Sequence, residues 1–274
     1  MPECFEVKKM AQYLIDSELE NSKIISFSFC NKGERILKND LPATLIKRVT
    51  GQTIESIKTK AKFTFVQLET DVIVWHYRFT GIPHIDGESY IDKLQTLYSL
   101  PIAPKNTEKY SRFILKTNTG KTLRYIDTRC LSTLEIYKNT SIDELKKYCD
   151  MPLDLSQCTK IKNEELKKNK GKSIKMYLLD QYTRPSGIGN YLACEICAES
   201  GIFPNTHVKT LTTEQINKLN NAIKKVSDLA FRNIGYDWFI VFNKQRCARC
   251  KNIVSKEKFK KYEQTTHWCS YCQN

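Results

Sequence analysis

The amino-acid sequence predicts an α+β multidomain protein: an N-terminal helix plus an antiparallel β-sandwich, then a helical domain with a C-terminal zinc finger. Three observations predict this class. Short alternating runs of apolar residues fill the first half of the chain, helical periodicity replaces them after about residue 140, and four paired cysteines lie near the C-terminus. We expect domains at residues 1–138, 139–239 and 240–274.

The first segment, PECFEVKKMAQYLID, predicts an amphipathic helix. Its apolar residues recur at helical spacing at Val7, Met10, Ala11, Leu14 and Ile15. Proline is tolerated in the first turn of a helix, where its missing N–H is no loss. We therefore expect Pro2 to start this helix.

The runs that follow alternate between apolar and polar residues, as half-buried strands do. We expect strands at residues 23–30, 62–69, 71–79, 112–117, 122–127 and 133–137. Two pairs join through turns, at Thr70-Asp71 and at Asn118 to Gly120. This pattern favours an antiparallel sandwich or barrel.

Helical signals dominate after residue 140. We expect helices at residues 141–149, 173–182, 190–200 and 212–231. Ser141 with Glu144 and Thr212 with Gln215 form capping boxes, and Gly201 ends the third helix. The basic stretch at 160–175 is either a solvated helix face or an edge that contacts phosphate.

The charge indicates a polyanionic partner. Lysine and arginine total 44 against 30 acidic residues, a net charge of +14 with a pI near 9.2, which favours nucleic acid over membrane. No apolar run is long enough to span a bilayer, and the first residues lack a basic-then-apolar signal pattern, so we expect no secretion. Seven scattered cysteines suit an intracellular, reducing compartment, nuclear or cytoplasmic.

Four cysteines predict a structural metal site. Cys247 and Cys250 form one C-x-x-C pair, and Cys269 and Cys272 form the other. Two such pairs supply four thiolates for one tetrahedral Zn²⁺ and leave no open position for catalysis. Residues 240–274 hold eight Lys/Arg and two Glu, so this zinc ribbon suits DNA; the alternatives are a ribbon that only folds the tail or docks a protein.

A glycine turn, RPSGIGNYLACE, lies between two predicted helices. Its two glycines and the following helix N-terminus could cradle a phosphate, or could form a simple tight turn. It lacks the preceding strand and third glycine of a dinucleotide-binding fingerprint.

Several motifs together carry a family resemblance. They are MPECFEV at the start, AKF at 61–63, HYRFTG at 76–81, DTR at 127–129, GIGNYLACE at 187–195 and the four-cysteine finger. In this order they resemble the formamidopyrimidine-DNA glycosylase/endonuclease VIII family of base-excision repair enzymes. The resemblance spans nearly the whole chain and implies a β-sandwich, a helix–two-turn–helix domain and a zinc finger around damaged DNA.

The resemblance implies a catalytic role for three residues. Pro2, freed by removal of Met1, matches the family nucleophile, and the positive end of the following helix disfavours an ammonium there. Glu3 matches the catalytic acid and Lys62 the lysine near the damaged nucleotide, although Lys58 and Lys60 alternate on the same face. Glu6 also matches the motif, and its alternative role is to complement the helix dipole.

Other matching residues would bind DNA. Arg78 and Phe79 match one loop that fills the gap left by a flipped nucleotide, and Arg129 and Leu131 match the second. The family often has an aromatic residue in place of Leu131. Structurally, Phe79 and Leu131 could also be core residues.

Two further residues match phosphate contacts, Asn190 and Lys175, with a plain N-cap as the alternative for Asn190. The chain departs from the family at Gln264, where the finger of other members carries an arginine. The phosphate contact could then pass to one of the basic residues Arg246, Arg249, Lys260 and Lys261.

The implied activity is that of a bifunctional glycosylase and abasic-site lyase, acting as a monomer on duplex or single-stranded damaged DNA. The segment at 232–246 is short, which favours the endonuclease VIII-like branch, whose members remove oxidised pyrimidines and hydantoins. The alternatives are an 8-oxoguanine-preferring glycosylase, a member that binds damage without excising it, and a non-catalytic zinc-ribbon DNA-binding protein.

Overall fold

The computed structural model describes residues 2–88, 94, 106–232, 235–259 and 264–273. The chain divides into two units, Met1–Asp150 and Met151–Asn274. Each unit is described by itself. The first contains the expected sandwich and, where one helix was expected at 141–149, two short helices. The second contains the other expected helices and the cysteine ribbon.

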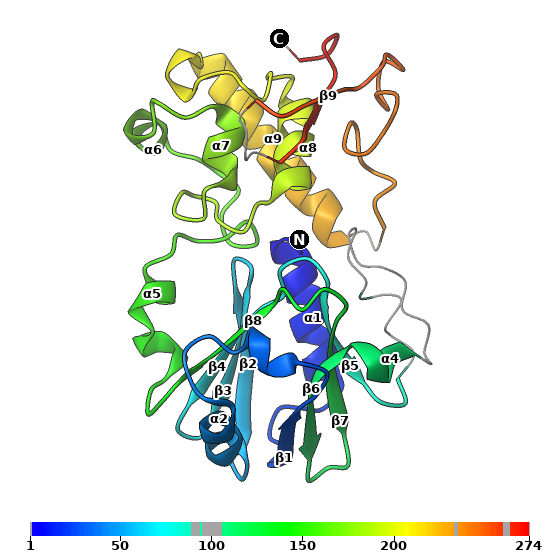
Figure 1. Ribbon diagram of the computed structural model, residues 1–274. Coiled ribbons are helices and arrows are strands. Elements are labelled where there is room, and N and C mark those ends of the chain that lie inside the picture. Colours follow the sequence, from blue (N-terminus) through cyan, green and yellow to red (C-terminus); the bar gives the residue numbers. More distant parts are fainter. Residues whose placement is uncertain (1, 89–93, 95–105, 233–234, 260–263, 274) are drawn as a thin grey trace. The chain divides into compact units, whose positions relative to one another are not determined.

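Two four-stranded antiparallel sheets form the first unit (Figure 1). The first sheet has the order β1 (Ile24–Phe29), β6 (Ser111–Thr117), β7 (Thr122–Asp127), β5 (Gly81–Ile85). The second has the order β2 (Ile54–Lys60), β3 (Phe63–Leu68), β4 (Val72–His76), β8 (Thr133–Tyr137). Apolar side chains of both sheets pack into one core with helix α1. The predicted antiparallel sandwich is confirmed.

Helix α1 spans Cys4–Asp16 and buries the predicted stripe, with Val7 and Leu14 fully inaccessible and Ile15 half-buried at its edge. The expected start at Pro2 is wrong by two residues. Glu3 is the N-cap because its side chain and that of Glu6 form a capping box, which leaves Pro2 just outside the helix.

The elements of the first unit that the sequence patterns missed include β2, β5 and helix α2 (Pro42–Val49). β5 contains Gly81 and Pro83, which usually argue against a strand, but it is an edge strand and tolerates a missing N–H. The remaining short helices are η1 (Gly33–Ile36), α4 (Thr107–Tyr110), η3 (Ile142–Glu144) and α5 (Lys146–Cys149).

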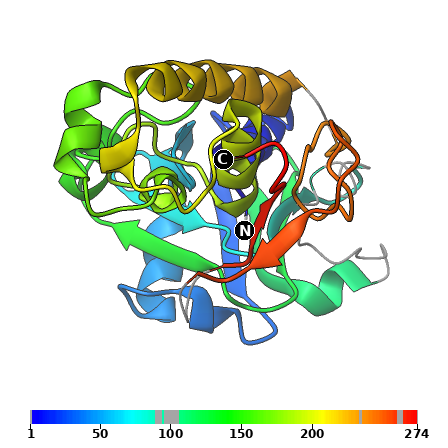
Figure 2. The same ribbon diagram turned by 90° about the horizontal axis from the view of Figure 1, so that it is seen from above.

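The second unit is mainly helical (Figures 1 and 2). Its helices are α6 (Asn163–Lys168), α7 (Ile174–Leu179), α8 (Asn190–Ser200), η4 (Val208–Thr210) and α9 (Thr213–Arg232). The long α9 packs its apolar stripe along α8, and Gly201 ends α8 at φ +72°, as predicted. Strands β9 (Ser255–Glu257) and β10 (Thr266–Trp268) form an antiparallel hairpin. No helix of the described ranges is long and apolar enough to cross a membrane.

Candidate active site

The N-terminus of α1 holds two carboxylates in a fixed arrangement. The backbone N–H of Glu3 donates to Oε2 of Glu6 over 2.8 Å, and the Glu3 side chain accepts from the N–H of Glu6. Glu3 is 1% exposed, and Pro2 before it is also buried. Glu6 thus lies in the first turn of α1, where its alternative role of complementing the helix dipole placed it, and it also caps the helix beside Glu3.

Lys62 lies on the two-residue turn of the β2–β3 hairpin, since Lys60 pairs with Phe63. Ala61 adopts φ +53° there, which fits the mirror-image turns that match strand twist. Lys62 is 4% exposed, whereas Lys58 is exposed and Lys60 donates to the carbonyl of Cys149 over 2.8 Å. Burial thus separates Lys62 from the two lysines that shared its pattern.

Helix α1 packs on β2 and β3 and brings this turn to the two carboxylates. Burial lowers the pKa of the Lys62 ammonium, and the charges of Glu3 and Glu6 oppose this shift. A buried lysine with a depressed pKa beside a buried acid is the arrangement expected of a proton-transfer site.

His76 belongs to the same surroundings, although no role for it was predicted from the sequence. It ends β4, pairs with Phe63 across the sheet, and its Nδ1 accepts the backbone N–H of Arg78 over 3.2 Å. Burial, helped by the charges of Arg78 and Lys62, lowers its pKa to about 3, so the imidazole is neutral at pH 7. The sequence feature that could have identified His76 as a site residue is its position at the start of the HYRFTG motif.

The four predicted wedge residues come together from two loops. Arg78 and Phe79 lie between β4 and β5, and Arg129 and Leu131 lie between β7 and β8. The guanidinium carbon of Arg129 is 5.4 Å from the centre of the Phe79 ring. Leu131 is 42% exposed and Phe79 is half-buried, so neither is a core residue. Their role in DNA stays a prediction.

In the second unit, Asn190 is the first residue of α8 rather than its cap. The carbonyl of Gly189 accepts the first helical bond, from Ala193, so Gly189 is the N-cap. Asn190 Nδ2 donates to the carbonyl of Thr265 over 2.9 Å, while its Oδ1 is buried and has no hydrogen-bond partner among the described residues. The amide therefore links α8 to the ribbon.

Lys175 differs from what a phosphate contact requires. It lies in α7, is fully buried, and its Nζ donates to the carbonyl of Gln264 over 2.9 Å and to Oγ1 of Thr266 over 2.5 Å. An accessible ammonium is needed to reach a phosphate. In this structure the side chain instead ties α7 to the β9–β10 hairpin.

We therefore expect Lys175→Met to destabilise the second unit by about 1–3 kcal/mol, because the carbonyl of Gln264 loses a charged donor. The salt dependence of DNA binding should not change. Urea unfolding and DNA titrations at several salt concentrations measure the two effects, with the exposed Lys224→Met of α9 as control. A salt slope smaller by about 0.9 would instead support a phosphate contact.

The four predicted metal ligands meet at the C-terminal ribbon. The sulfurs of Cys247, Cys250, Cys269 and Cys272 all lie within 4.8 Å of one another. Tight turns shape each pair: Lys251 N–H donates to the carbonyl of Cys247, and Cys272 N–H to that of Cys269. Four thiolates at this spacing fit a tetrahedral metal ion with every position taken by protein. No other such group occurs within the described ranges.

The candidates that could replace the absent finger arginine are partly engaged. Arg249 forms an ion pair with Glu199 and donates to the carbonyl of Ala198, and Arg246 donates to the carbonyl of Lys251. Lys260 and Lys261 lie outside the described residues. Gln264 is exposed and uses its carbonyl for Lys175.

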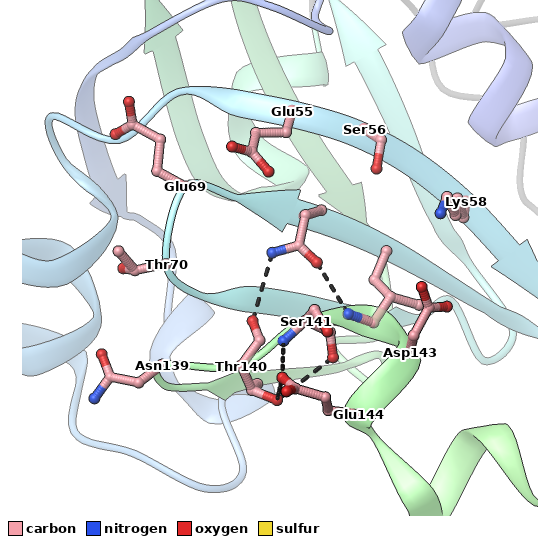
Figure 3. A pocket seen from close by; sticks show the side chains of 12 residues that line it. Glu55, Ser56, Lys58, Glu69, Thr70, Asn139, Thr140, Ser141, Asp143 and Glu144 are labelled. Atoms are coloured by element: carbon pink, nitrogen blue, oxygen red, sulfur yellow. Dashed lines mark hydrogen bonds between the residues drawn. The ribbon is translucent and has the colours of Figure 1, made fainter.

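A polar groove of about 630 Å³ lies toward the other end of the β2–β3 hairpin from Lys62. Figure 3 shows its labelled side chains, with Glu55, Ser56 and Lys58 on β2 facing the segment from Asn139 to Glu144. Its lining has four carboxylates and one lysine. This charge repels phosphate, and none of the predicted site residues lines it.

Comparison with known proteins agrees with this geometry. Residues 1–134 match the family model of the formamidopyrimidine-DNA glycosylase N-terminal domain. The formamidopyrimidine-DNA glycosylase of Ureaplasma parvum serovar 3 is 29% identical over the full length of both chains, and that of Listeria innocua is 24% identical over 100% of this chain and 98% of its own. Over its whole length the chain is therefore similar to formamidopyrimidine-DNA glycosylases.

Solved structures share the whole fold. The Lactococcus lactis formamidopyrimidine-DNA glycosylase bound non-covalently to DNA with an abasic site superposes with a TM-score of 0.80, at 23% identity over 99% of each chain. The same enzyme in complex with a formamidopyrimidine-containing DNA gives 0.79. Both findings place the sandwich, the helices and the ribbon in one known fold.

Proposed function

We propose that this protein is a base-excision repair DNA glycosylase that also cleaves the strand at abasic sites. The observation that carries the proposal is the buried meeting of Glu3 and Lys62 beside Pro2 at the head of α1. Similarity to formamidopyrimidine-DNA glycosylases supports the same chemistry.

In the proposed reaction, the free amine of Pro2 attacks C1′ of the damaged nucleotide. Glu3 protonates O4′ as the N–C1′ bond forms and the C1′–O4′ bond breaks. The Pro2 nitrogen then loses its proton to the departing base, and the bond from C1′ to the base breaks to leave an iminium. The resulting iminium acidifies the proton on C2′. Loss of that proton expels the 3′ phosphate, and a second elimination expels the 5′ phosphate.

The remaining site residues have proposed roles in holding DNA. Phe79 and Leu131 offer exposed apolar surface to fill the space of an everted nucleotide, and Arg78 and Arg129 add positive charge beside them. Asn190 is proposed to contact a phosphate near the N-terminus of α8. We propose that the protein acts as a monomer on duplex or single-stranded DNA.

We propose zinc as the metal of the cysteine ribbon, because four thiolates in two C-x-x-C turns suit this ion. With all four positions taken by sulfur, its role is to fold the β9–β10 hairpin. Acid–base and covalent chemistry stay with the side chains of the first unit.

Oxidised pyrimidines and hydantoins are the proposed lesions, because the segment between α9 and Cys247 is short. Purine lesions, formamidopyrimidines or 8-oxoguanine, are the second candidate, and the names of the relatives favour formamidopyrimidines. Oligonucleotides carrying thymine glycol, dihydrouracil, hydantoins, formamidopyrimidine or 8-oxoguanine, single-stranded and duplex, separate the two by initial cleavage rates.

Borohydride trapping tests the proposal. Incubating the protein with abasic-site DNA and borohydride should reduce the iminium to a stable covalent adduct, which Pro2→Gly should diminish or remove. A non-catalytic DNA-binding ribbon would give no adduct. Mass spectrometry of the chain supplies an independent check, since Met1 retained on an active protein contradicts a Pro2 nucleophile.

A further inference from the structure

The two loops that carry Arg78, Phe79, Arg129 and Leu131 share one buried acceptor, Asp127. This carboxylate ends β7 and is fully inaccessible. Its hydrogen bonds reach both loops, which are far apart in the sequence. In the sequence, Asp127 is the first residue of the DTR motif.

Asp127 accepts hydrogen bonds from five donors. They are the hydroxyl of Thr80, the backbone N–H groups of Arg129 (3.1 Å), Leu131 (2.8 Å) and Ser132 (2.9 Å), and the hydroxyl of Ser132 (2.7 Å). Three backbone donors come from its own loop, and Thr80 comes from the other. The carboxylate therefore fixes the β7–β8 loop and joins it to the β4–β5 loop.

Two more contacts link the β4–β5 loop to the β7–β8 loop. The N–H of Arg129 also lies 3.3 Å from Oγ1 of Thr80, and the hydroxyl of Ser132 is 3.1 Å from the carbonyl of Tyr77. Gly81 leaves room for this packing, since a Cβ there would collide with the hydroxyl oxygens of Tyr125 and Ser132.

Both loops contain a residue in a strained backbone conformation. Arg78 has φ +53° and Cys130 has φ +52°, in the left-handed region that costs a non-glycine residue about 1 kcal/mol or more. Such residues persist only where surrounding bonds hold them. The bonds to Asp127 on either side of Cys130, and from Thr80 two residues after Arg78, provide this restraint.

We propose that Asp127, through Thr80, is a positioning residue that holds both loops as one wedge, and that the wedge is needed to evert a nucleotide from a duplex. The proposal rests on the function proposed above. It assigns Asp127 no part in the chemistry at the sugar. Loss of its bonds should therefore impair duplex substrates and spare a sugar that is already accessible.

The test compares Thr80→Val, which removes the hydroxyl at nearly constant volume, with Thr80→Ser, which retains it. Excision of a lesion from a duplex is measured in single turnover, and borohydride trapping is measured on a single-stranded abasic oligonucleotide. Misplaced wedge loops should lower the duplex rate about 10- to 100-fold in Thr80→Val. Thr80→Ser should restore that rate, and single-strand trapping should be unchanged in both variants.

Asp127→Asn should show the same split between substrates. If it fails to fold, the Thr80 pair still decides the question. Equal losses on both substrates, or normal duplex excision by Thr80→Val, would overturn the proposal. A wild-type protein that is inactive on both substrates would instead refute the proposed function, so the two failures are distinguishable.

Discussion

Replacing Glu3 with glutamine should slow release of a damaged base by about 10²- to 10⁴-fold, the contribution typical of a positioned acid or base. Glutamine has nearly the same shape, and its amide oxygen can still accept the N–H of Glu6, so the cap of α1 should survive. It cannot protonate an opening sugar. Single-turnover excision at saturating enzyme measures the effect directly.

Glu6→Gln is the matched control for Glu3→Gln. Both carboxylates are buried, both belong to the capping box, and both act on the pKa of Lys62. If Glu3 is the acid, Glu6→Gln should leave the cap of α1 equally intact, because its amide oxygen can still accept the N–H of Glu3, and it should cost much less activity. Comparable losses from the two variants would contradict a specific role for Glu3.

Replacing Cys269 with serine should abolish tight metal binding and unfold the ribbon. Structural zinc contributes about 10–16 kcal/mol of apparent binding free energy to such small sites, and hard serine oxygen is a poor substitute for thiolate. Elemental analysis after dialysis against a chelator should find about one zinc per wild-type chain and far less in the variant. DNA affinity should fall with it, because the hairpin that contacts Lys175 and Asn190 loses its fold.

Cys149→Ser supplies the control for the metal experiment. Cys149 is an exposed thiol in α5, in the other unit, and it belongs to no cluster of potential ligands in the described part of the chain. Its substitution should leave zinc content and DNA affinity unchanged. A full zinc equivalent in Cys269→Ser would show that the ion is held elsewhere.

Local signals predicted much of this molecule. The capping box of Thr212 and Gln215, where Gln215 N–H donates to the Thr212 hydroxyl over 3.2 Å, needs only neighbouring residues, and it starts α9 as expected. The cysteine spacing is similarly local, because each pair brings two sulfurs together through its own turn. Features set within a few residues leave their pattern in the sequence.

Features set by distant contacts left little pattern. In the sequence, Pro83 argues against a strand. Only the strand pairing shows that β5 is an edge strand, where a proline is tolerated. Lys175 resembles any other lysine of a basic stretch, and only the fold reveals that its ammonium is buried against the ribbon. Asp127 collects donors from two loops, one of them 47 residues away, so its importance could not be read from spacing.

At the N-terminus of α1, a side chain that stabilises the helix through the capping box is also proposed to take part in the chemistry. The carboxylate proposed to donate a proton also terminates a helix, and the proposed nucleophile directly precedes it. Fraying of this first turn would release both groups together, at little cost to the rest of the sandwich. The catalytic rate should therefore depend on whether this first helical turn is ordered. A substitution that only weakly disturbs the turn should abolish activity while the rest of the protein stays folded.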